Sequence, residues 1–539
     1  MFACEKRGTI EISEGDGQME TTLYFGGSFL TMEQPTYAQA LVEQAGRIVY
    51  VGTLEEAERL AGSKARRVNL EGRTLLPAFV DAHSHLLACA YARLQVPLGD
   101  CTSWDEIVNR LRLQVQTRAI PPGAWVKGTG YDSNALEEGT PPDRWALDRA
   151  CPHNPVVIQH TSGHAGVFNT LALERLGVQS GACDLPRDAR GELTGRVEET
   201  PFLNLLGQVP LESLEEVLAA FQEAQTDYLS HGIATAQEGL LQAAMVPVYR
   251  EILKRGLLRL DVGAYASPGE YAALKADFAQ AVNAGSGRFH LAGEKIFLDG
   301  SPQGRTAWMR EPYVGGGYGT SAMTDAQVLE VFEQALDQGV QLLAHCNGDA
   351  AAEQYLTLLE QAERKKGKRL RRPVMIHAQL LGKDQLEQVK RLQVILSFFV
   401  AHVYHWGEIH IKNFGLERAC AISPVGSALR QGIPFTFHQD SPVIPPDMLE
   451  TLWCACTRRT KAGRVLGEEE RISIEAGLGA VTQNAAFQYF AESEKGSLRA
   501  GKRADFVLLS GDPRKTAPED LKKLQVEETI KDGCSLWRR

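Results

Sequence analysis

The chain has 539 residues, of which 44% are hydrophobic and 23% charged, and its formal net charge is −10. This length can hold one large catalytic domain and at least one companion. No run is apolar and long enough to span a bilayer, and the acidic balance argues against a nucleic-acid groove, which would gather Lys and Arg. The one basic run, 364–369, is interpreted as a solvated helix end. We therefore expect partners other than membranes and nucleic acids.

The N-terminus and the cysteines indicate the compartment. Residues 1–19 carry charges where a secretory signal would have its apolar stretch, so we expect a loose leader without an export signal. The ten cysteines include no CxxC pair, and a chain of this size needs no disulfides. Cys454 and Cys456 form the closest pair, which alone is a weak metal signal. Reduced thiols and a cytoplasmic location fit these features best.

The first ordered elements are short strands, and similar strands return at the C-terminus. TTLYFGGSFLTM and ALVEQAGRIVYVGT read as strands joined by glycine-containing turns, and ADFVLLSGD and VEETIKDGCSLWRR have the same character. Unpaired short strands would leave exposed edges. We therefore predict that residues 20–73 and 490–539 form one small β-sandwich.

A second kind of strand begins at Thr74 with TLLPAFVDAHSH. The next strand of this kind begins only at Ile233, and such a separation is far longer than an ordinary loop. Residues of about 100–230 are therefore predicted to form an inserted lobe, in which WVKGTGYDSNAL and PVVIQHTSGHAGVF look structured.

From residue 230 onward, short apolar strands alternate with amphipathic helices, which is typical of parallel β/α units. In TDAQVLEVFEQALDQG, for example, an apolar stripe ends at a glycine suited to a helix C-cap. Together with the strand at Thr74, the predicted strands number eight, and a (β/α)₈ barrel over 74–489 accommodates them most economically. An open doubly wound sheet is the alternative, but DAHSHLLAC lacks the glycine-rich loop that such a sheet requires. The later strands begin at Ile233, Arg259, Gly293, Val340, Pro373, Val394 and Pro434.

Two histidines lie where the first barrel strand ends. His83 and His85 are two residues apart, so in an extended strand their side chains face the same way. The carboxyl ends of the strands form the rim on which barrel enzymes build their sites, and neutral imidazoles suit a metal such as zinc. The pair alone is also compatible with chance, or with core and surface histidines.

Other polar residues lie at comparable positions on separate strands. His345 and His377 each end an apolar strand, Asp440 follows the last strand, and Lys295 lies within the apolar EKIFL. A single buried histidine is more often an ordinary hydrogen-bonded core residue. Four such residues on separate strands of one barrel indicate a shared site.

Lys295 and Asp440 have both structural and chemical interpretations. A lysine among Ile296, Phe297 and Leu298 pays a desolvation cost that lowers its pKa, and the neutral amine can take up carbon dioxide to form an anionic carbamate. The alternative is a lysine that snorkels or pairs with Asp299 or Glu294. Asp440 fits either a helix N-cap or a proton carrier beside a metal-bound water.

With these residues in place, the sequence resembles the amidohydrolase superfamily, and within it the amidohydrolase family 3 group that includes N-substituted formamide deformylases. The resemblance runs nearly end to end and rests on LPAFVDAHSHL, KIFLDGSPQGRTAW, AHCNGDAA, IHAQLL, HQDSPV and GKRADFVLLSGDP. It implies a two-metal site in which carboxylated Lys295 bridges the ions and Asp440 both binds the first ion and carries the proton. The implied histidine ligands are His83 and His85 on the first metal and His345 and His377 on the second.

The resemblance also implies that the inserted lobe helps to shape a substrate pocket. Weak pocket candidates, each with a structural role as its alternative, are Trp125, Tyr131, Asp132, His164 and Arg305. His402 and His405 lie near the end of the seventh strand, and His402 is the better candidate for contacting a substrate carbonyl.

One departure from the family pattern concerns His438. Many relatives have a small residue in a GSD-like motif, whereas this chain reads His438-Gln439-Asp440. The additional imidazole would narrow the pocket, contact the substrate or interfere with the metal arrangement.

The predicted reaction is hydrolysis of a carbon–nitrogen bond in an amide, formamide or cyclic amide. A hydroxide bridging two divalent cations, with zinc as the default metal, would attack the carbon, and Asp440 would protonate the departing amine. The alternatives are a mononuclear deaminase of a heterocycle, in which Lys295 stays an amine, and a catalytically silent barrel that binds a small ligand or a partner protein. A homodimer is the expected assembly, because closed twofold oligomers are the commonest.

Overall fold

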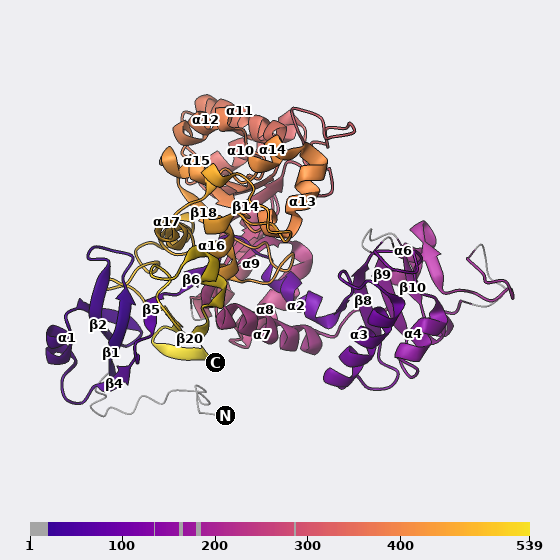
Figure 1. Cartoon of the computed structure of the whole chain (residues 1–539), viewed down its shortest axis with the longest axis horizontal. Helices are drawn as coiled ribbons and strands as arrows, with labels where there is room; N and C mark the ends of the chain where they lie inside the picture. Colours follow the sequence, from indigo (N-terminus) through magenta and orange to yellow (C-terminus); the bar gives the residue numbers. More distant parts are fainter. Residues whose placement is uncertain (1–19, 134, 161–164, 179–184, 285–286) are drawn as a thin grey trace.

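The computed structural model describes residues 20–133, 135–160, 165–178, 185–284 and 287–539, so the predicted leader 1–19 lies outside the described residues. The described strands form three sheets. In Figure 1 a sheet built from the two chain ends lies at one side, the segment predicted as an inserted lobe lies at the opposite side, and the largest body lies between them.

The central sheet contains eight strands that pair in parallel, from β6 at one edge to β18 at the other. Its curl brings the two ends together, because the backbone N–H of His85, after β6, donates to the carbonyl of Ser441, after β18, at 2.8 Å. This arrangement is consistent with the predicted barrel. The strands are β6 (Phe79–Val80), β12 (Ile233–Leu241), β13 (Asp261–Ala266), β14 (Phe289–Phe297), β15 (Gln341–Cys346), β16 (Val374–His377), β17 (Ile395–Phe398) and β18 (Phe435–Phe437).

The helices between these strands follow the predicted amphipathic pattern. α10 (Asp325–Gln338) begins after a capping box at Thr324 and ends at Gly339, whose positive φ of 68° is the left-handed conformation that glycine adopts freely. Its apolar stripe, including Val328 and Phe332, is buried in the main core. The other helices packed around the barrel include α8 (Val246–Lys254), α9 (Tyr271–Ala284), α11 (Asp349–Lys366), α12 (Leu386–Arg391) and α16 (Met448–Thr457).

The predicted first barrel strand is too long. Thr74–Pro77 forms β5, which pairs with β1 and β19 in the sheet of the chain ends, and only Phe79–Val80 belongs to the barrel. Every residue from Thr74 to Val80 is buried, so the apolar run serves two sheets in succession. The crossing is at Ala78, whose N–H donates to Asp505 at 3.0 Å while that of Phe79 donates to Gly232 at 2.8 Å.

The strands of both chain ends form one sheet in the order β21-β20-β19-β5-β1-β2-β3, with β4 also paired to β1. The predicted hairpin character is confirmed, because β1–β2, β2–β3 and β20–β21 pair antiparallel. Packing of this sheet as a sandwich stays a prediction. The strands are β1 (Thr21–Leu30), β2 (Tyr37–Gln44), β3 (Arg47–Gly52), β4 (Arg66–Asn69), β19 (Phe506–Leu509), β20 (Val526–Lys531) and β21 (Cys534–Arg538).

A five-stranded sheet lies in the segment predicted as an inserted lobe and has clusters of buried residues of its own. Its strands are β7 (Val96–Pro97), β8 (Val126–Tyr131), β9 (Val156–His160), β10 (Ala165–Phe168) and β11 (Arg196–Glu198), with helices α3 (Trp104–Thr117), α4 (Arg144–Ala150) and α6 (Glu199–Leu206). In contrast, α7 (Leu214–Ser230) buries Phe221 in the main core. This last part of the predicted 100–230 insertion therefore packs with the barrel.

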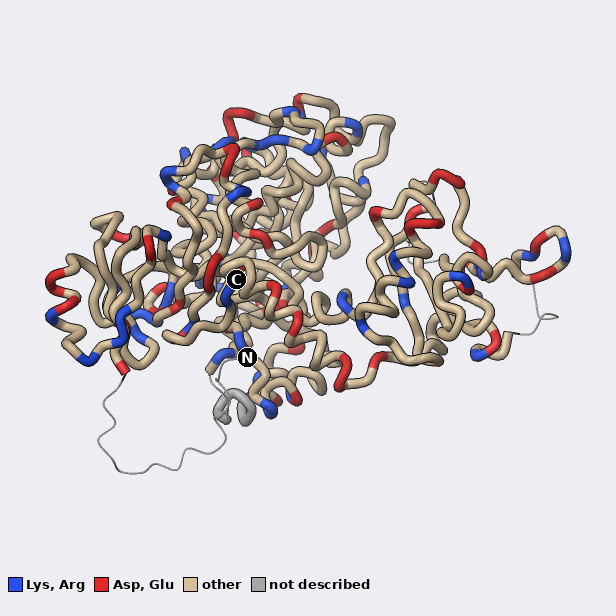
Figure 2. The backbone as a smooth tube through the Cα atoms, turned by 60° about the horizontal axis from the view of Figure 1, so that its bottom comes forward, with Lys and Arg blue, Asp and Glu red and all other residues tan. Residues whose placement is uncertain are grey.

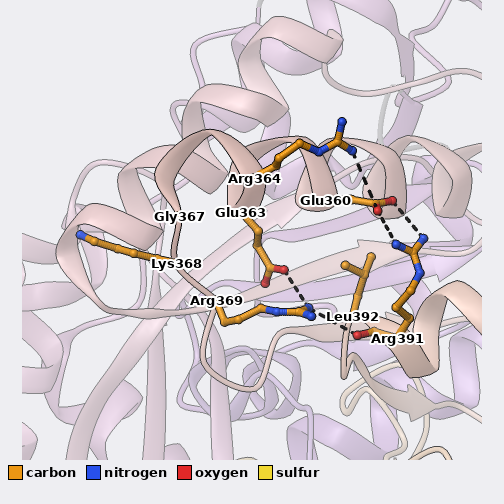
Figure 3. Close-up of a pocket in the computed structure, with 8 residues that line it drawn as sticks. All are labelled: Glu360, Glu363, Arg364, Gly367, Lys368, Arg369, Arg391 and Leu392. Atoms are coloured by element: carbon orange, nitrogen blue, oxygen red, sulfur yellow. Dashed lines mark hydrogen bonds and ion pairs between the residues drawn. The ribbon is translucent and has the colours of Figure 1, made fainter.

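The basic run 364–369 is a helix end, as predicted. Lys365 and Lys366, in the last turn of α11, lie 2.6 Å from Glu333 and Asp337, respectively. Figure 3 shows the pocket beside this helix end, where Arg369 pairs with Glu363 and Arg391 with Glu360. In Figure 2, Lys and Arg (blue) and Asp and Glu (red) are both scattered over the described chain. The cations of this run are therefore neutralised by neighbouring carboxylates.

Two further expectations concern the compartment. Among the helices that the structure describes, none is long and apolar enough to cross a membrane. The cysteines of the described part are free, and Cys454 and Cys456 are both buried in α16. The cytoplasmic location and the homodimer stay predictions.

Candidate metal centre

Six residues predicted from strand ends lie together at the carboxyl end of the barrel. His83 and His85 follow β6, Lys295 lies in β14, His345 in β15, and His377 ends β16; Asp440 follows β18. Parallel strands direct their carboxyl ends to the same rim, so residues more than 350 positions apart in the sequence become neighbours. Contacts within hydrogen-bond or ion-pair distance connect all six residues.

The carboxylate of Asp440 lies at the middle of this group. Its Oδ1 is 3.1 Å from His83 Nε2 and 3.6 Å from His85 Nε2, and its Oδ2 is 3.9 Å from His377 Nε2. Donor atoms of His83, His85 and Asp440 all lie within 4.8 Å of one another. Although Oδ1 is buried, it has no hydrogen-bond partner within the described chain. A buried carboxylate oxygen without a donor is costly unless a cation accompanies it.

Asp440 is not the helix N-cap that its position in the sequence also allowed. The helix that follows is α16, and its N-cap is Asp447, whose side chain accepts from the backbone N–H groups of Leu449 and Glu450. The backbone of Asp440 has a φ of 54°, a left-handed conformation that costs energy for a residue with a Cβ. The loop after β18 therefore holds this carboxylate at the rim despite the backbone cost.

The second pair of histidines lies on the other side of Asp440. His345 Nδ1 is 3.1 Å from His377 Nε2, and the two rings meet edge to face. The other nitrogen of His345, Nε2, lies 3.2 Å from the carbonyl oxygen of Gly300. The same Nε2 also lies 3.0 Å from the amide nitrogen of Asn347. Gly300 can only accept and the amide nitrogen can only donate, so together these two neighbours fix the orientation of the ring, with Nδ1 toward His377.

The tautomer of His83 is set by Gln237 in β12. Gln237 Nε2 donates to the carbonyl of Ala82 at 2.9 Å, which fixes the orientation of the amide, and its Oε1 lies 2.5 Å from His83 Nδ1. The proton of His83 is therefore on Nδ1, and the lone pair of Nε2 faces Asp440. Beside it, the buried Oε1 of Glu238 lies 4.0 Å from His85 Nδ1.

His438 lies behind His377. Its Nε2 is 3.1 Å from His377 Nδ1, the nitrogen that does not face His345, and its Nδ1 is 2.9 Å from the hydroxyl of Ser397. The side chain is fully buried. Of the roles considered for this departure from the family pattern, the contacts support none directly, because His438 holds a neighbouring histidine through its outer nitrogen.

Lys295 is buried within the centre, with 1% of its surface exposed. Its Nζ lies 2.9 Å from His83 Nε2 and 4.8 Å from the centroid of the Phe297 ring. Burial lowers the pKa of Lys295 to about 8. Neither alternative partner is used, because Asp299 accepts from the backbone N–H groups after β15 and before α11, and Glu294 accepts from Gly269.

The electrostatics of the centre fit a divalent cation. Burial lowers the pKa of His85 to about 3 and that of His345 to about 4, so these rings are neutral at pH 7. Burial also holds the pKa values of His83 and His377 well below their usual range. Several neutral imidazole nitrogens and one carboxylate therefore converge, and too few protons lie between them to pair every acceptor. Such a group is the ligand set that zinc and similar metals accept.

The pattern of the amidohydrolase family matches residues 66–536. This chain belongs to the amidohydrolase family. The amidohydrolase is 26% identical to the N-substituted formamide deformylase of Arthrobacter pascens, over 97% of this chain and 99% of that protein. It is 27% identical to the Bacillus subtilis (strain 168) protein named as amidohydrolase YtcJ, over 96% of this chain and 99% of that protein.

Solved structures give the same result. An uncharacterized metal-dependent hydrolase from Pyrococcus furiosus is 26% identical to the amidohydrolase and superposes with a TM-score of 0.73, covering 92% of this chain and 100% of that chain. The resemblance stated from the motifs is therefore confirmed. The family match and this solved relative, which is itself a metal-dependent hydrolase, agree.

The weak pocket candidates that the structure describes have partners in their own segments of the chain. Trp125 and Tyr131 pack into the cores of the lobe, and Asp132 lies 3.7 Å from His160. Arg305 donates to the carbonyls of Val314 and Gly316 in its own loop, so its guanidinium holds that loop. His164 lies outside the described residues.

The two histidines after β17 have different surroundings. His402 Nδ1 lies 3.2 Å from His410 Nε2, and the ring of His402 packs edge to face on Phe399. His405 Nε2 lies 2.8 Å from Glu450, which also pairs with Lys522. His402 therefore stays the better candidate for contacting a substrate carbonyl, because His405 is already engaged with a carboxylate.

Sequence reasoning missed the residues that hold the ligands. Gln237 and Glu238 are polar residues within the buried strand β12, and Ser397 is a polar residue within the buried strand β17. A polar residue inside an apolar strand was the available signal, because burial without a partner is costly. His410, in the middle of a helical segment, gave no comparable signal.

Proposed function

We propose that this amidohydrolase hydrolyses a non-peptide carbon–nitrogen bond of an amide, formamide or cyclic amide at the centre around Asp440. The observation that carries the proposal is the buried and unpaired Asp440 Oδ1, which faces His83 and His85 while Oδ2 faces His377. The similarity to a protein named N-substituted formamide deformylase supports a carbon–nitrogen substrate.

The residues present would hold two divalent cations, with zinc as the first choice. His83, His85 and Asp440 would bind one ion, and His345 and His377 the other. These assignments are supported by His83, whose Nδ1 faces the acceptor of Gln237 and leaves Nε2 inward, and by His345, whose Nδ1 faces His377.

Lys295 would bridge the ions as a carbamate. Its pKa of about 8, lowered by burial, leaves part of the amine neutral at neutral pH. The nitrogen lone pair would form a bond to the carbon of carbon dioxide while the nitrogen loses one proton, which gives an anionic group with two oxygens. That group would supply the negative charge that a pair of cations requires.

The chemistry then divides between the ions and Asp440. When bound, divalent cations polarise a carbonyl and lower the pKa of water to about 7. Asp440 would accept a proton from the attacking water and return it to the leaving nitrogen, so that the amine departs neutral. Its position supports this role, since His83 and His85 lie within 4 Å of one of its oxygens and His377 lies within 4 Å of the other.

A substrate panel tests the proposal. Protein loaded with zinc is incubated with N-formyl compounds, N-acyl compounds and cyclic ureides, and the metal content per chain is determined by elemental analysis. We expect a carboxylic acid and an amine from an open-chain substrate, or a single ring-opened acid from a cyclic one, with two metals per chain. Ammonia released with one metal per chain would favour the mononuclear deaminase, and no product from any compound would contradict hydrolysis.

A further inference from the structure

A pair of buried histidines lies at the same end of the barrel outside the predicted ligand set. His402 and His410 both belong to α13 (His402–Phe414), which begins soon after β17. Residues eight positions apart in a regular helix are separated by about 12 Å along its axis. Here the two rings lie 3.2 Å apart at their nitrogens and stack with centroids 5.4 Å apart.

A break in α13 makes this contact possible. Trp406 has non-helical angles (φ −128°, ψ 15°), which divide the helix between the two histidines. The next residue, Gly407, has no room for a Cβ, which would lie 2.3 Å from the side chain of Thr460. The break is therefore fixed by packing, and it places His410 beside His402.

The tautomer of His410 follows from its other nitrogen. Nδ1 is buried and has no hydrogen-bond partner among the residues that the structure describes. Burial lowers the pKa of His410 to about 4, so the ring is neutral and carries one proton. A buried N–H without an acceptor is rarer in proteins than an acceptor without a donor. The proton is therefore on Nε2, which donates to His402 Nδ1.

The tautomer of His402 follows in turn. Burial holds the pKa of His402 well below its usual range, so this ring is also neutral. Because Nδ1 accepts from His410, its single proton is on Nε2. Among the residues that the structure describes, Nε2 has no hydrogen-bond partner, whereas Nδ1 is engaged by His410. His402 is thus a neutral hydrogen-bond donor whose N–H is available.

The position of His402 connects it to the metal centre. The Phe399 ring lies against His402, with centroids 4.6 Å apart, and also against His438 and His377, with centroids 5.6 and 6.4 Å apart. Trp406 packs beside His402 with a centroid distance of 4.5 Å. His402 is therefore one aromatic ring away from the predicted ligand His377, at the rim of the neighbouring strand.

We propose that His402 donates its Nε2–H to the carbonyl oxygen of the substrate and that His410 is the positioning residue that fixes this tautomer. The proposal rests on the proposed function and adds a second source of oxyanion stabilisation to it. As the water oxygen forms its bond to the carbon, the carbonyl π electrons move onto the oxygen, and the N–H donor meets the developing charge. Because both rings are neutral, the donor is present throughout the neutral pH range.

Neutron diffraction from crystals exchanged into D₂O tests the tautomers without any substrate. We expect deuterium on Nε2 of both His402 and His410, and none on Nδ1 of either ring. Deuterium on His402 Nδ1 would overturn the proposal, whether or not the protein proves to be a hydrolase.

Turnover of formanilide, followed by aniline release, tests the contact with substrate. His402→Leu should lower kcat about 100-fold to 1,000-fold with the zinc content unchanged, as expected for one oxyanion donor. His402→Gln keeps an N–H donor and should recover part of that loss. His410→Phe should lower kcat with little change in KM, because it removes the positioning bond alone.

The matched control is His405→Gln, on the same helix, which should keep wild-type turnover. Equal rates for His402→Leu and His405→Gln would contradict the proposal. If the wild type does not cleave formanilide, that result counts against the proposed function. The neutron result still decides the tautomer of His402.

Discussion

Both ends of the barrel bury charged groups, but among the described residues the charges are paired at the amino end and left without charged partners at the carboxyl end. At the amino end of β13, Asp261 Oδ2 accepts from Lys531 at 2.8 Å and Arg503 at 3.1 Å, and Lys495 also contacts it. At the carboxyl end, Asp440 lies among neutral imidazoles, and its Oδ1 has no donor in the described chain. A buried charge that serves structure is compensated, whereas a site leaves groups unpaired for what it binds.

The same contrast appears in the lysines. Lys531 is buried and lies 2.8 Å from Asp261 and 3.2 Å from Asp505. Lys295 is equally buried, but its nearest polar partner is the neutral His83. The first lysine connects the barrel to the sheet of the chain ends, and the second is available for chemistry. Substitutions at the carboxyl end should therefore lower turnover or metal affinity, whereas substitutions at the amino end should lower the free energy of unfolding.

The largest effect is expected at Asp440. Asp440→Asn should lower the turnover of formanilide by up to about 10⁴-fold, because it removes the proton carrier. Most of the bound zinc should remain, since His83 and His85 are intact. Turnover and metal content are measured on the same preparation. Asp447→Asn is the control: it keeps an N-cap residue on α16 and should keep wild-type turnover. Wild-type turnover in Asp440→Asn would contradict the assigned role.

At the other end, Asp261→Asn should cost stability. Lys495 would lose its carboxylate partner and Lys531 one of its two, which destabilises by about 3–5 kcal/mol at pH 7. Burial alone would raise the pKa of Asp261, but Lys495, Lys531 and Arg503 outweigh burial and hold that pKa well below its usual value. The stabilisation is therefore present above the ordinary Asp pKa of about 4 and is lost as the pH falls below it.

Urea unfolding of the metal-free protein at several pH values measures this difference. Asp277→Asn is the control, because Asp277 pairs with Arg250 at the surface and should change the free energy of unfolding by less than about 1 kcal/mol. The free energy of unfolding of the wild type should exceed that of Asp261→Asn by less as the pH falls. If this excess grew as the pH fell, the stabilising role of the Asp261 carboxylate would be contradicted.

A smaller effect is expected behind the metal ligands. His438→Phe keeps a ring but removes the bond to His377 Nδ1, and it should lower zinc affinity about 10-fold to 100-fold. Ser397→Ala removes only the partner of His438 and should have a weaker effect in the same direction. Competition against a chelator measures both affinities. Unchanged affinity in His438→Phe would mean that the bond does not orient the ligand.

The sequence predicted the eight barrel strands because each is an apolar run, and it predicted the six central residues because each is a polar residue within such a run or just after its end. It did not show that Thr74–Pro77 belongs to a different sheet, since every residue of the run is buried in either case. A run of apolar residues indicates that a strand is buried, but it does not indicate which strand it pairs with.

The supporting contacts were beyond sequence reasoning for a different reason. Gln237 meets His83, and Ser397 meets His438, only because strands distant in the sequence become neighbours. His410 meets His402 only because α13 breaks at Trp406. A regular helical pattern predicts that these two rings lie far apart.

The most direct test of the central claim, that six residues meet around two cations, is the zinc content of wild type and Lys295→Ala, with and without a short carboxylic acid such as acetate or propionate. The account predicts two zinc ions per chain in the wild type, fewer in Lys295→Ala, and recovery of both zinc and turnover when the acid replaces the missing carbamate. Two zinc ions per chain and wild-type turnover in Lys295→Ala without any acid would contradict it.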